Sequence, residues 1–437
     1  MYWTGLIFAL CLGVGVYFFI QKIKEIIANI RLGRSENRFD QPQERWKTML
    51  RVAFGQSKMG QRPIPALLHF LVYIGFVIIN LEVLEICIDG LFGTHRIFSF
   101  LGSFYVFLIS SFEILAVLVI VSCVLFLIRR YFLKIPRFHS QELTEKPRAD
   151  ARNILLIEII LMLGFLTMNS AEAVLSLRPD ALVEYQKVNI SAFFLTKNFN
   201  FFFDIFSTST LISIERSAWW IHILGILAFL NYLPYSKHFH IILAFPATYF
   251  SNLRKKGTFL PLPTITGEVQ TMLDPNFVNH QPVPERFGAK DIDDLSWKNL
   301  LDAYSCTECG RCTSVCPANT TGKLLSPRKI LMDTRDRLEE IGAEKKQGKN
   351  FKEDGKTLLD TYISREELLA CTTCNACTEA CPINLDPLSI ILQMRQYVLM
   401  DEGQSPQAWQ NMLNNVENLG SPWAFSSENR LQWKEEI

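Results

Sequence analysis

Eight of the 11 cysteines lie in two runs of identical spacing. Each run has three cysteines at three-residue intervals and a fourth directly before a proline: Cys306, Cys309, Cys312 and Cys316, then Cys371, Cys374, Cys377 and Cys381. This spacing is typical of bacterial [4Fe–4S] proteins, in which three thiolates bind one cluster and the fourth binds the other. The sequence therefore predicts two ligand sets: Cys306, Cys309, Cys312 and Cys381 for the first cluster, and Cys371, Cys374, Cys377 and Cys316 for the second.

Zinc is the alternative metal for closely spaced cysteines, and disulfides are the alternative to any metal. Zinc sites favour paired cysteines separated by long gaps, which runs of four do not match. The basic residues of the chain predict a cytoplasmic address for both runs, and thiols stay reduced there. The remaining Cys11, Cys87 and Cys123 lie in apolar stretches, and we expect them to pack without binding a metal.

A second set of candidate ligands consists of histidines in apolar surroundings. His69 lies near the start of one apolar stretch, and His222 and His240 lie 18 residues apart around another. At about 100° per helical residue, this separation returns His240 to the helix face of His222 and puts His238 about 160° away, unless Pro234 kinks the helix. Antiparallel helices bring His69 and His240 to the same depth, where two imidazoles can fill both axial positions of a haem iron. Interfacial histidines bonded to lipid or backbone are the alternative.

Carboxylates also lie within or beside the apolar stretches, among them Glu82, Glu85, Glu113 and Glu172. Such groups pair with one another, face a cavity or relay protons when they lie in a bilayer. A quinol site needs acceptors for two hydroxyl protons, so Glu82, Glu85 and His222 are candidates for a quinone or proton site. The alternative is that Glu85 and Glu172 simply lie at the membrane interface.

Five apolar stretches are long enough to position these residues in a membrane, which takes about 20 residues of helix. They cover residues 2–20, 64–88, 104–128, 154–176 and 216–236. The first has no basic region before it and no small-residue cleavage site, and Lys22 and Lys24 follow it directly. We therefore interpret it as an uncleaved membrane span.

The distribution of basic residues predicts the orientation. Ten Lys and Arg residues lie between the first and second stretches and seven between the third and fourth, whereas the loop between the second and third has only Arg96. The positive-inside rule then places the N-terminus outside and the cysteine runs in the cytoplasm of a bacterial cell, with the spans in its inner membrane. The net charge of only +1 excludes a broadly basic nucleic-acid binder.

The composition changes after Lys256. Of 33 phenylalanines, 29 precede residue 261, and a group of prolines marks an extended connector over residues 251–290. Helix starts at Ser326, Ser364 and Asp386 surround the second cysteine run. We therefore predict an all-α chain: a five-span transmembrane helix bundle (1–250), this linker (251–290), a cytoplasmic all-helical two-cluster ferredoxin domain (291–400) and a C-terminal tail (401–437).

Residues 216–243, with His222, the run from Pro234 to Lys237 and His240, resemble the last span of the cytochrome b subunit of respiratory nitrate reductase. The resemblance covers about residues 1–250 through the five-span topology. It implies that His69 and His240 ligate a haem b on the cytoplasmic side. It also implies that His222 occupies the position of a ligand to a second haem.

The second span departs from this pattern. Ile79 and Asn80 stand about where the partner of His222 is expected, and neither ligates haem iron in the usual way. Either His95 replaces the missing ligand or His222 binds quinone instead. We therefore expect one haem b, with the second in doubt.

Residues 291–400 resemble the helical two-cluster ferredoxin domain of heterodisulfide reductase small subunits and of succinate dehydrogenase iron–sulfur proteins. Many relatives add a domain with a paired Cys-Cys motif, whereas this sequence has no adjacent cysteines and no GxGxxG fingerprint. Chemistry on a soluble substrate is therefore expected on a partner. The resemblance implies a Cys-Cys-motif iron–sulfur subunit, an electron-transfer flavoprotein or a flavin dehydrogenase.

Together these features predict a membrane electron-transfer subunit of a quinone-linked respiratory oxidoreductase. Electrons would pass between menaquinone or ubiquinone, haem b, two [4Fe–4S] clusters and a cytoplasmic partner. Two alternatives need the clusters but no haem: a membrane-tethered iron–sulfur assembly factor and a membrane redox sensor. Whether the chain is itself an enzyme stays open, since the sequence contains no recognisable site for a soluble substrate.

Overall fold

The protein is described by a computed structural model that covers residues 2–255, 257–259, 262–280, 286–349 and 351–435. Within these ranges the regular structure is helical, and β pairing is limited to isolated bridges between Arg34 and Ser296 and between Leu359 and Ile363. The predicted all-α fold is therefore confirmed.

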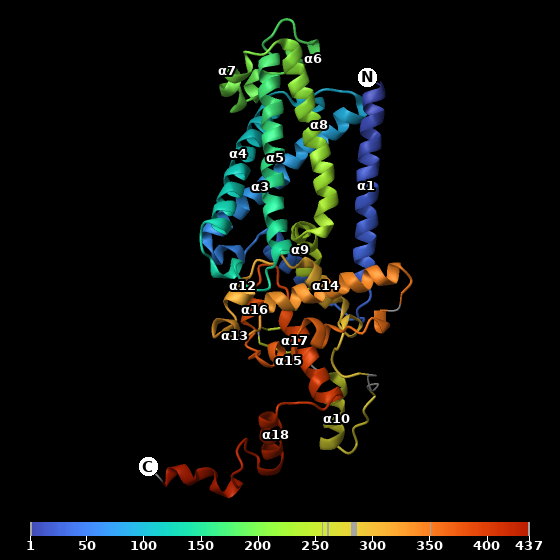
Figure 1. Cartoon of the computed structure of the whole chain (residues 1–437), viewed down its shortest axis with the longest axis vertical. Coiled ribbons are helices and arrows are strands. Elements are labelled where there is room, and N and C mark those ends of the chain that lie inside the picture. Colours follow the sequence, from blue (N-terminus) through green and yellow to red (C-terminus); the bar gives the residue numbers. More distant parts are fainter. Residues whose placement is uncertain (1, 256, 260–261, 281–285, 350, 436–437) are drawn as a thin grey trace.

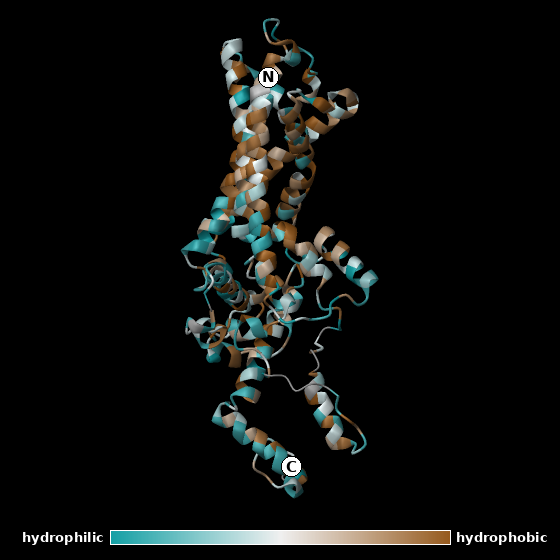
Figure 2. Cartoon of the chain, turned by 90° about the vertical axis from the view of Figure 1, so that its right-hand side faces the viewer, coloured by the Kyte–Doolittle hydropathy of each residue, from teal (hydrophilic) through white to brown (hydrophobic). Residues whose placement is uncertain are grey.

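Five helices of the described residues are long and apolar enough to cross a membrane. They are α1 (Tyr2–Ile30), α3 (Pro63–Phe92), α4 (Ser103–Tyr131), α5 (Glu145–Leu175) and α8 (Thr208–Tyr232). Most extend past the predicted stretches because polar residues continue the helix; α5, for example, begins nine residues before its predicted start at residue 154. Hydrophobic residues predominate along these helices in Figure 2. The predicted five-span bundle is confirmed.

The bundle is built around α5, which packs against α4 and α8, while α3 packs against α4. Phe165 of α5 is fully buried in this core. α1 stands at the edge of the bundle and contacts α3 and α8 (Figure 1). Its Phe8 packs on Trp219 with ring centres 5.5 Å apart, and Gly90 leaves the space, since a Cβ there would lie 2.7 Å from the Phe8 ring.

Short elements connect the long helices. Between α1 and α3 lie α2 (Pro42–Met49), a π-helical turn (Leu50–Phe54) and a 3₁₀ turn (Met59–Gln61). Further 3₁₀ turns lie at Ile97–Leu101 and Pro136–Phe138. The end of the bundle farthest from the cysteine runs, called the distal end, is capped by α6 (Val183–Gln186), α7 (Asn200–Phe203) and 3₁₀ turns at Ile190–Ala192 and Thr196–Phe199.

α8 stops at Tyr232, and the chain turns before it reaches His240. Two 3₁₀ segments, Leu233–Tyr235 and Lys237–Phe239, precede α9 (His240–Tyr249). Pro234 accounts for the break because it lacks the N–H that a continuing helix needs and its ring clashes with the preceding turn. The prediction that His222 and His240 share a helix face is therefore wrong, since they do not lie on one helix.

Both cysteine runs lie in a helical unit, called here the cysteine domain. Its helices are α11 (Trp297–Ser305), α12 (Arg311–Ser314), α13 (Pro317–Thr320), α14 (Pro327–Lys346), α15 (Arg365–Leu369), α16 (Ala376–Ala380) and α17 (Pro387–Gln396). Shorter turns lie at Ile292–Asp294, Phe351–Glu353, Leu358–Tyr362 and Tyr397–Asp401. Ser326, Ser364 and Asp386 cap α14, α15 and α17 as predicted, with Glu367 completing a capping box.

The cysteine domain packs against the foot of the bundle, where α14 lies across the end of α1 (Figure 1). The backbone N–H of Arg34 donates to the carbonyl of Leu295 at 2.7 Å, and that of Trp297 donates back to Arg34 at 3.1 Å. The amide of Asn29 on α1 donates to the Tyr304 hydroxyl at 2.9 Å. These contacts join the two halves of the chain along the end of one membrane helix.

Two further helices project away from the cysteine domain in Figure 1: α10 (Pro263–Leu273) and α18 (Gln407–Leu419). A 3₁₀ segment, Ser427–Lys434, follows α18. The segment predicted as an extended connector thus contains a helix, which begins at Pro263 because proline fits the first helical turn. Pro261, Pro282 and Pro284 lie outside the described residues.

Candidate redox sites

The two cysteine runs have the same local backbone. Each begins just after a helix, turns through a loop and continues into a short helix, α12 or α16, and these two short helices pack together. Left-handed residues occupy matching positions two and four residues after the first cysteine: Glu308 and Gly310 in the first run, Thr373 and Asn375 in the second. The loops therefore form a structural repeat that curls around its own cysteines.

The fourth cysteine of each run lies near cysteines of the other run. A small cavity of about 20 Å³ is lined by Cys306, Cys309, Cys312 and Cys381, together with Cys377. Cys312 lies close enough to Cys306, Cys309, Cys381 and Cys377 for their charges to interact, and Cys371 lies close enough to Cys316 and Cys374. The structure thus brings together the four cysteines of the first predicted set and places Cys316 near Cys371 of the second.

The donor chemistry of these residues fits iron–sulfur clusters. Backbone N–H groups point at sulfur, from Thr373 to Cys371 at 3.4 Å and from Leu385 to Cys381 at 3.3 Å. Burial raises the pKa of Cys306 and of Cys381 to about 12, so these thiols ionise only with a compensating cation such as cluster iron. Within the described ranges no three Cys, His, Asp or Glu side chains converge as ligands of one ion would. A cubane instead spreads its thiolates over four irons.

His69 and His240 face each other at the foot of the bundle, with ring centres 6.4 Å apart and ring planes at 43°. With metal–nitrogen bonds of about 2 Å on either side of an iron and the ring radii added, an axial pair has ring centres about 6 Å apart. The Nδ1 of His69 lies 3.2 Å from the Gln56 side-chain oxygen, and that of His240 lies 3.0 Å from the Lys237 carbonyl oxygen. These acceptors hold the proton on Nδ1 and leave Nε2 as a lone-pair donor.

The geometry therefore fits a haem iron between these two imidazoles. Across the described residues, neither Nε2 makes a hydrogen bond. Helical periodicity puts His238 on another helix face, but its ring lies 5.6 Å from that of His240, and its Nε2 lies 3.8 Å from a carboxylate oxygen of Glu158. Burial lowers the pKa of His238 to about 3, so its imidazole is neutral. The turn after α8 brings it there, which a continuous helix would not do.

His222 and His95, the candidates for a second haem, have different neighbours. His222 lies within α8, where its Nδ1 is 2.9 Å from the Leu161 carbonyl oxygen and its ring packs near Phe165. His95 lies in the distal loop, where its Nε2 is 2.8 Å from Glu172 and its ring packs on Tyr185. Burial opposes protonation of His95, but the Glu172 carboxylate raises the pKa of this imidazole. The structure does not bring the two histidines together.

The candidate proton site contains a residue that sequence reasoning missed. Arg96 is buried, and its guanidinium contacts Glu82 at 3.0 Å, Glu172 at 2.6 Å and Asn169 at 2.7 Å. Glu85 accepts hydrogen bonds from the Tyr105 hydroxyl and the Phe98 backbone, both at 2.8 Å. A lone arginine in a loop between acid-bearing spans was the available signal, because an intramembrane carboxylate needs a partner.

A cavity of about 350 Å³ opens beside this cluster at the distal end. Its lining includes Glu85, His95, Arg96, Tyr185 and Trp219. Glu82 lies deeper, and its Oε2 has no hydrogen-bond partner within the described part of the chain. Glu82 and Glu85 are thus brought together around Arg96, whereas His222 does not line the cavity.

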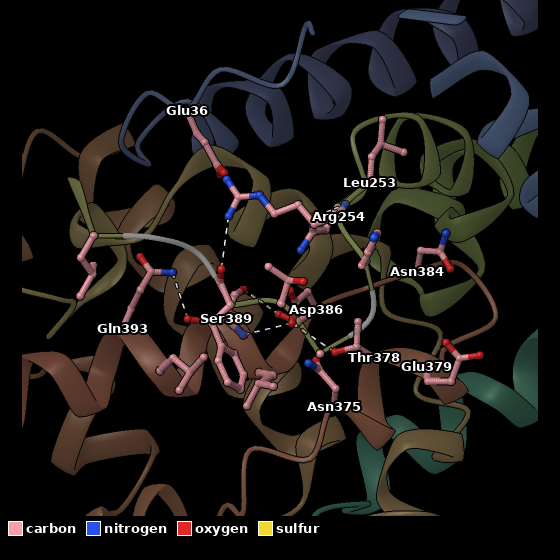
Figure 3. A pocket seen from close by; sticks show the side chains of 18 of the residues that line it. Glu36, Leu253, Arg254, Asn375, Thr378, Glu379, Asn384, Asp386, Ser389 and Gln393 are labelled. Carbon is pink, nitrogen blue, oxygen red and sulfur yellow. Dashed lines mark hydrogen bonds between the residues drawn. The ribbon is translucent and has the colours of Figure 1, made fainter. Parts of the chain in front are cut away.

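A larger cavity of about 970 Å³ lies on the side of the cysteine domain and extends to the second run (Figure 3). Asn375 and Thr378, which flank Cys377, line one end, and α17 contributes Ser389 and Gln393. Leu253 and Arg254, from the chain segment after α9, lie across the cavity from Asn375 and Thr378 in Figure 3. Cys374 of the second set is exposed, whereas Cys306 and Cys381 of the first set are buried.

Comparison with known proteins supports the iron–sulfur character of the two cysteine runs. Residues 305–385 match the family described as a 4Fe-4S dicluster domain. The chain is 29% identical over 463 aligned residues to the probable iron-sulfur-binding oxidoreductase FadF of Bacillus subtilis, covering 99% of this chain. It is 25% identical over 406 residues to the EtfAB:quinone oxidoreductase of Syntrophomonas wolfei, covering 88% of this chain.

The chain spans 61% and 53% of the length of these two relatives. A shorter match, 31% identical over 108 residues, is to one of the subunits of the ferredoxin:CoB-CoM heterodisulfide reductase of Methanosarcina mazei, and it covers 24% of this chain and 53% of that subunit. No solved structure matches the chain. The predicted iron–sulfur character, the membrane helices and the similarity to oxidoreductase and heterodisulfide reductase subunits are confirmed at this level.

Proposed function

We propose that this protein is a membrane electron-transfer subunit of a quinone-linked respiratory oxidoreductase. It would bind two [4Fe–4S] clusters through the two crossed cysteine sets and a haem b through His69 and His240. These cofactors supply one-electron chemistry, and the residues of the chain fix their positions and surroundings. The observation that carries the proposal is the facing pair of imidazoles, each with Nδ1 held by an oxygen acceptor.

The segments that hold this pair also contact the first cysteine set. Gln56 accepts from His69, and two residues later the Lys58 ammonium donates to the Cys381 carbonyl at 3.1 Å. The Arg311 guanidinium, beside Cys312, donates to the Lys58 carbonyl at 2.9 Å. The first set thus lies next to the histidine pair, and the second, with exposed Cys374, lies toward solvent. This order supports transfer between the membrane and a soluble partner at the second set.

The relatives support a choice of partners. One relative is named an EtfAB:quinone oxidoreductase, which pairs an electron-transfer flavoprotein with quinone, and another is a heterodisulfide reductase subunit. We propose menaquinone or ubiquinone in the membrane, and a cytoplasmic electron-transfer flavoprotein, Cys-Cys-motif iron–sulfur subunit or flavin dehydrogenase as the soluble partner. The asymmetry of basic residues supports an inner-membrane bundle (1–250) with an outside N-terminus, a linker (251–290), a cytoplasmic cysteine domain (291–400) and a tail (401–437).

Glu82 and Glu85 are proposed as proton acceptors of the quinone site. The Arg96 cluster and the distal cavity beside it offer a polar route from the bundle interior to the surface. Carboxylates buried at this depth are the groups that relay protons in membrane proteins. His222 lies apart from this cavity and stays a candidate ligand for a second haem.

The test is a pyridine haemochrome assay on the purified chain, combined with iron and sulfide analysis. We expect haem b in the wild type and its loss in His69→Ala and His240→Ala, with cluster iron retained. His139→Ala is the matched control, because this histidine lies in a loop outside the bundle. Clusters without any haem in the wild type would contradict the proposal and favour the assembly factor or the redox sensor.

A further inference from the structure

The turn between α8 and α9 contacts the loop of the first cysteine run. Lys237 lies in this turn, and its ammonium pairs with the Oε2 of Glu308, between Cys306 and Cys309. The other oxygen of Glu308 accepts from the Arg335 guanidinium of α14 at 2.8 Å. One carboxylate is thus held by two cations that belong to different parts of the chain.

Lys237 is itself fixed at its backbone and its side chain. Its N–H donates to Asp150 at 3.1 Å, and Asp150 also accepts from the Tyr232 hydroxyl at 2.5 Å. Its carbonyl accepts from the Nδ1 of His240 at 3.0 Å. Its ammonium donates to the Pro147 carbonyl at 2.8 Å besides pairing with Glu308. The same residue therefore orients a histidine of the facing pair and holds the cysteine loop.

Glu308 has the backbone conformation of a residue that its surroundings hold in place. Its φ of 53° lies in the left-handed region, which a glutamate rarely adopts without support. The side chains of Lys237 and Glu308 are only 11% and 3% exposed. Salt screens such a buried pair far less than a surface pair, so its charges act on their neighbours at nearly full strength.

We infer that Lys237 is a positioning residue that couples the histidine pair to the first cysteine set, holding its loop and supplying one of the two positive charges that offset Glu308. The inference rests on the proposed function, since it assumes a cluster at that set and a haem at His240. Removing the ammonium leaves the local charge one unit more negative, and this opposes reduction of a cluster held there. Removing the carboxylate charge has the opposite effect.

Redox titration followed by electron paramagnetic resonance of the full chain tests this inference. We expect Lys237→Met to shift the midpoint potential of one cluster downward and Glu308→Gln to shift the same cluster upward. The potential of the other cluster stays unchanged, and Cys309→Ala identifies which signal belongs to the first set. Lys237→Arg retains the pair and the wild-type potential, and the double variant Lys237→Met with Glu308→Gln returns close to it.

Lys346→Met is the control, because Lys346 also bridges the two halves of the chain, through Glu25 of α1 at 3.3 Å, but contacts neither cysteines nor histidines. Shifts of the same sign in Lys237→Met and Glu308→Gln, or equal shifts of both clusters, would show general loosening and overturn the inference. A wild type without [4Fe–4S] signals would instead refute the proposed function. Iron content and the haem spectrum of each variant separate misfolding from a true change of potential.

Discussion

The guanidinium of Arg96 reaches from the distal loop into the bundle and meets carboxylates from two membrane helices. Glu82 of α3 and Glu172 of α5 lie 3.0 and 2.6 Å from it, and these side chains are almost completely buried. A carboxylate moved out of water needs such a partner, because its desolvation costs more than any single neutral hydrogen bond returns. The residue thus makes the acid cluster compatible with the interior of the bundle.

Replacing Arg96 by Met should destabilise the protein by about 3–5 kcal/mol, because the substitution leaves buried carboxylates without their cation. Unfolding of the detergent-solubilised protein by added sodium dodecyl sulfate measures this loss. The double variant Arg96→Met with Glu172→Gln should recover part of it, since it also removes one uncompensated charge. Arg178→Met, on the same end of the bundle, should cost no more than about 1 kcal/mol, because that guanidinium lies partly in solvent. Equal losses for Arg96 and Arg178 would contradict this role.

The candidate functional residues differ in how well the sequence alone predicts their roles. The spacing of the cysteines predicts their role, since three of the four ligands of each cluster come from one loop. The spacing of Arg96, Lys237 and His238 predicts no such role, because Glu172, Glu308 and Glu158, their respective partners, lie in segments far away in the chain. Their roles depend on tertiary contacts, which periodicity and motifs do not encode.

At the scale of elements, local chemistry predicted the starts of helices in the cysteine domain better than the bounds of the membrane helices. Ser326, Ser364 and Asp386 cap the helices they were expected to cap, because a side-chain oxygen satisfies a free N–H in any context. The membrane helices were predicted too short, since their charged ends remain helical beyond the apolar core. Pro234 ended α8 where a kink was anticipated, and this break decides which histidines meet.

The close approach of the turn after α1 to the start of α11 gives a second prediction. A Cβ on Gly33 would lie 2.6 Å from the Trp297 nitrogen and 2.9 Å from the Leu295 carbonyl oxygen, both of them backbone atoms. Gly33→Ala should therefore push the cysteine domain from the bundle and cost about 1–3 kcal/mol, as overpacking does. Faster proteolysis between the two halves and a lower unfolding midpoint would register the change.

Gly13→Ala is the matched control within α1, because a Cβ there meets nothing within 4 Å. It should leave the midpoint unchanged or raise it slightly, since alanine favours helix over glycine. An equal loss from both alanines would show that the effect comes from α1 itself rather than from its contact with the cysteine domain.

At the scale of the whole molecule, the hydrophobic content of 49% is an average over an apolar N-terminal part and a more polar C-terminal part. These two parts fold as two units that are joined at an interface. The sequence predicted each part separately, because apolar length and cysteine spacing are local signals. It could not predict their interface, where Asn29 meets Tyr304 and Lys58 meets Cys381 across more than 270 residues of chain. Those contacts are what bring the histidine pair and the first cysteine set to the same place.

The crossing of the fourth cysteines ties the two runs into one unit and gives the last prediction. Cys381 lies with Cys306, Cys309 and Cys312, while Cys316 lies with Cys371. Alanine at Cys381 should therefore abolish the same electron paramagnetic resonance signal as alanine at Cys309, and alanine at Cys316 the same signal as alanine at Cys374. If an alanine variant loses all its iron, serine replacements, which keep a weaker ligand, provide the same test. Serine at Cys381 and serine at Cys309 should alter one electron paramagnetic resonance signal, and serine at Cys316 and serine at Cys374 should alter the other. Uncrossed ligation would instead pair Cys381 with Cys374, and the sharing of ligands across the two runs would then be refuted.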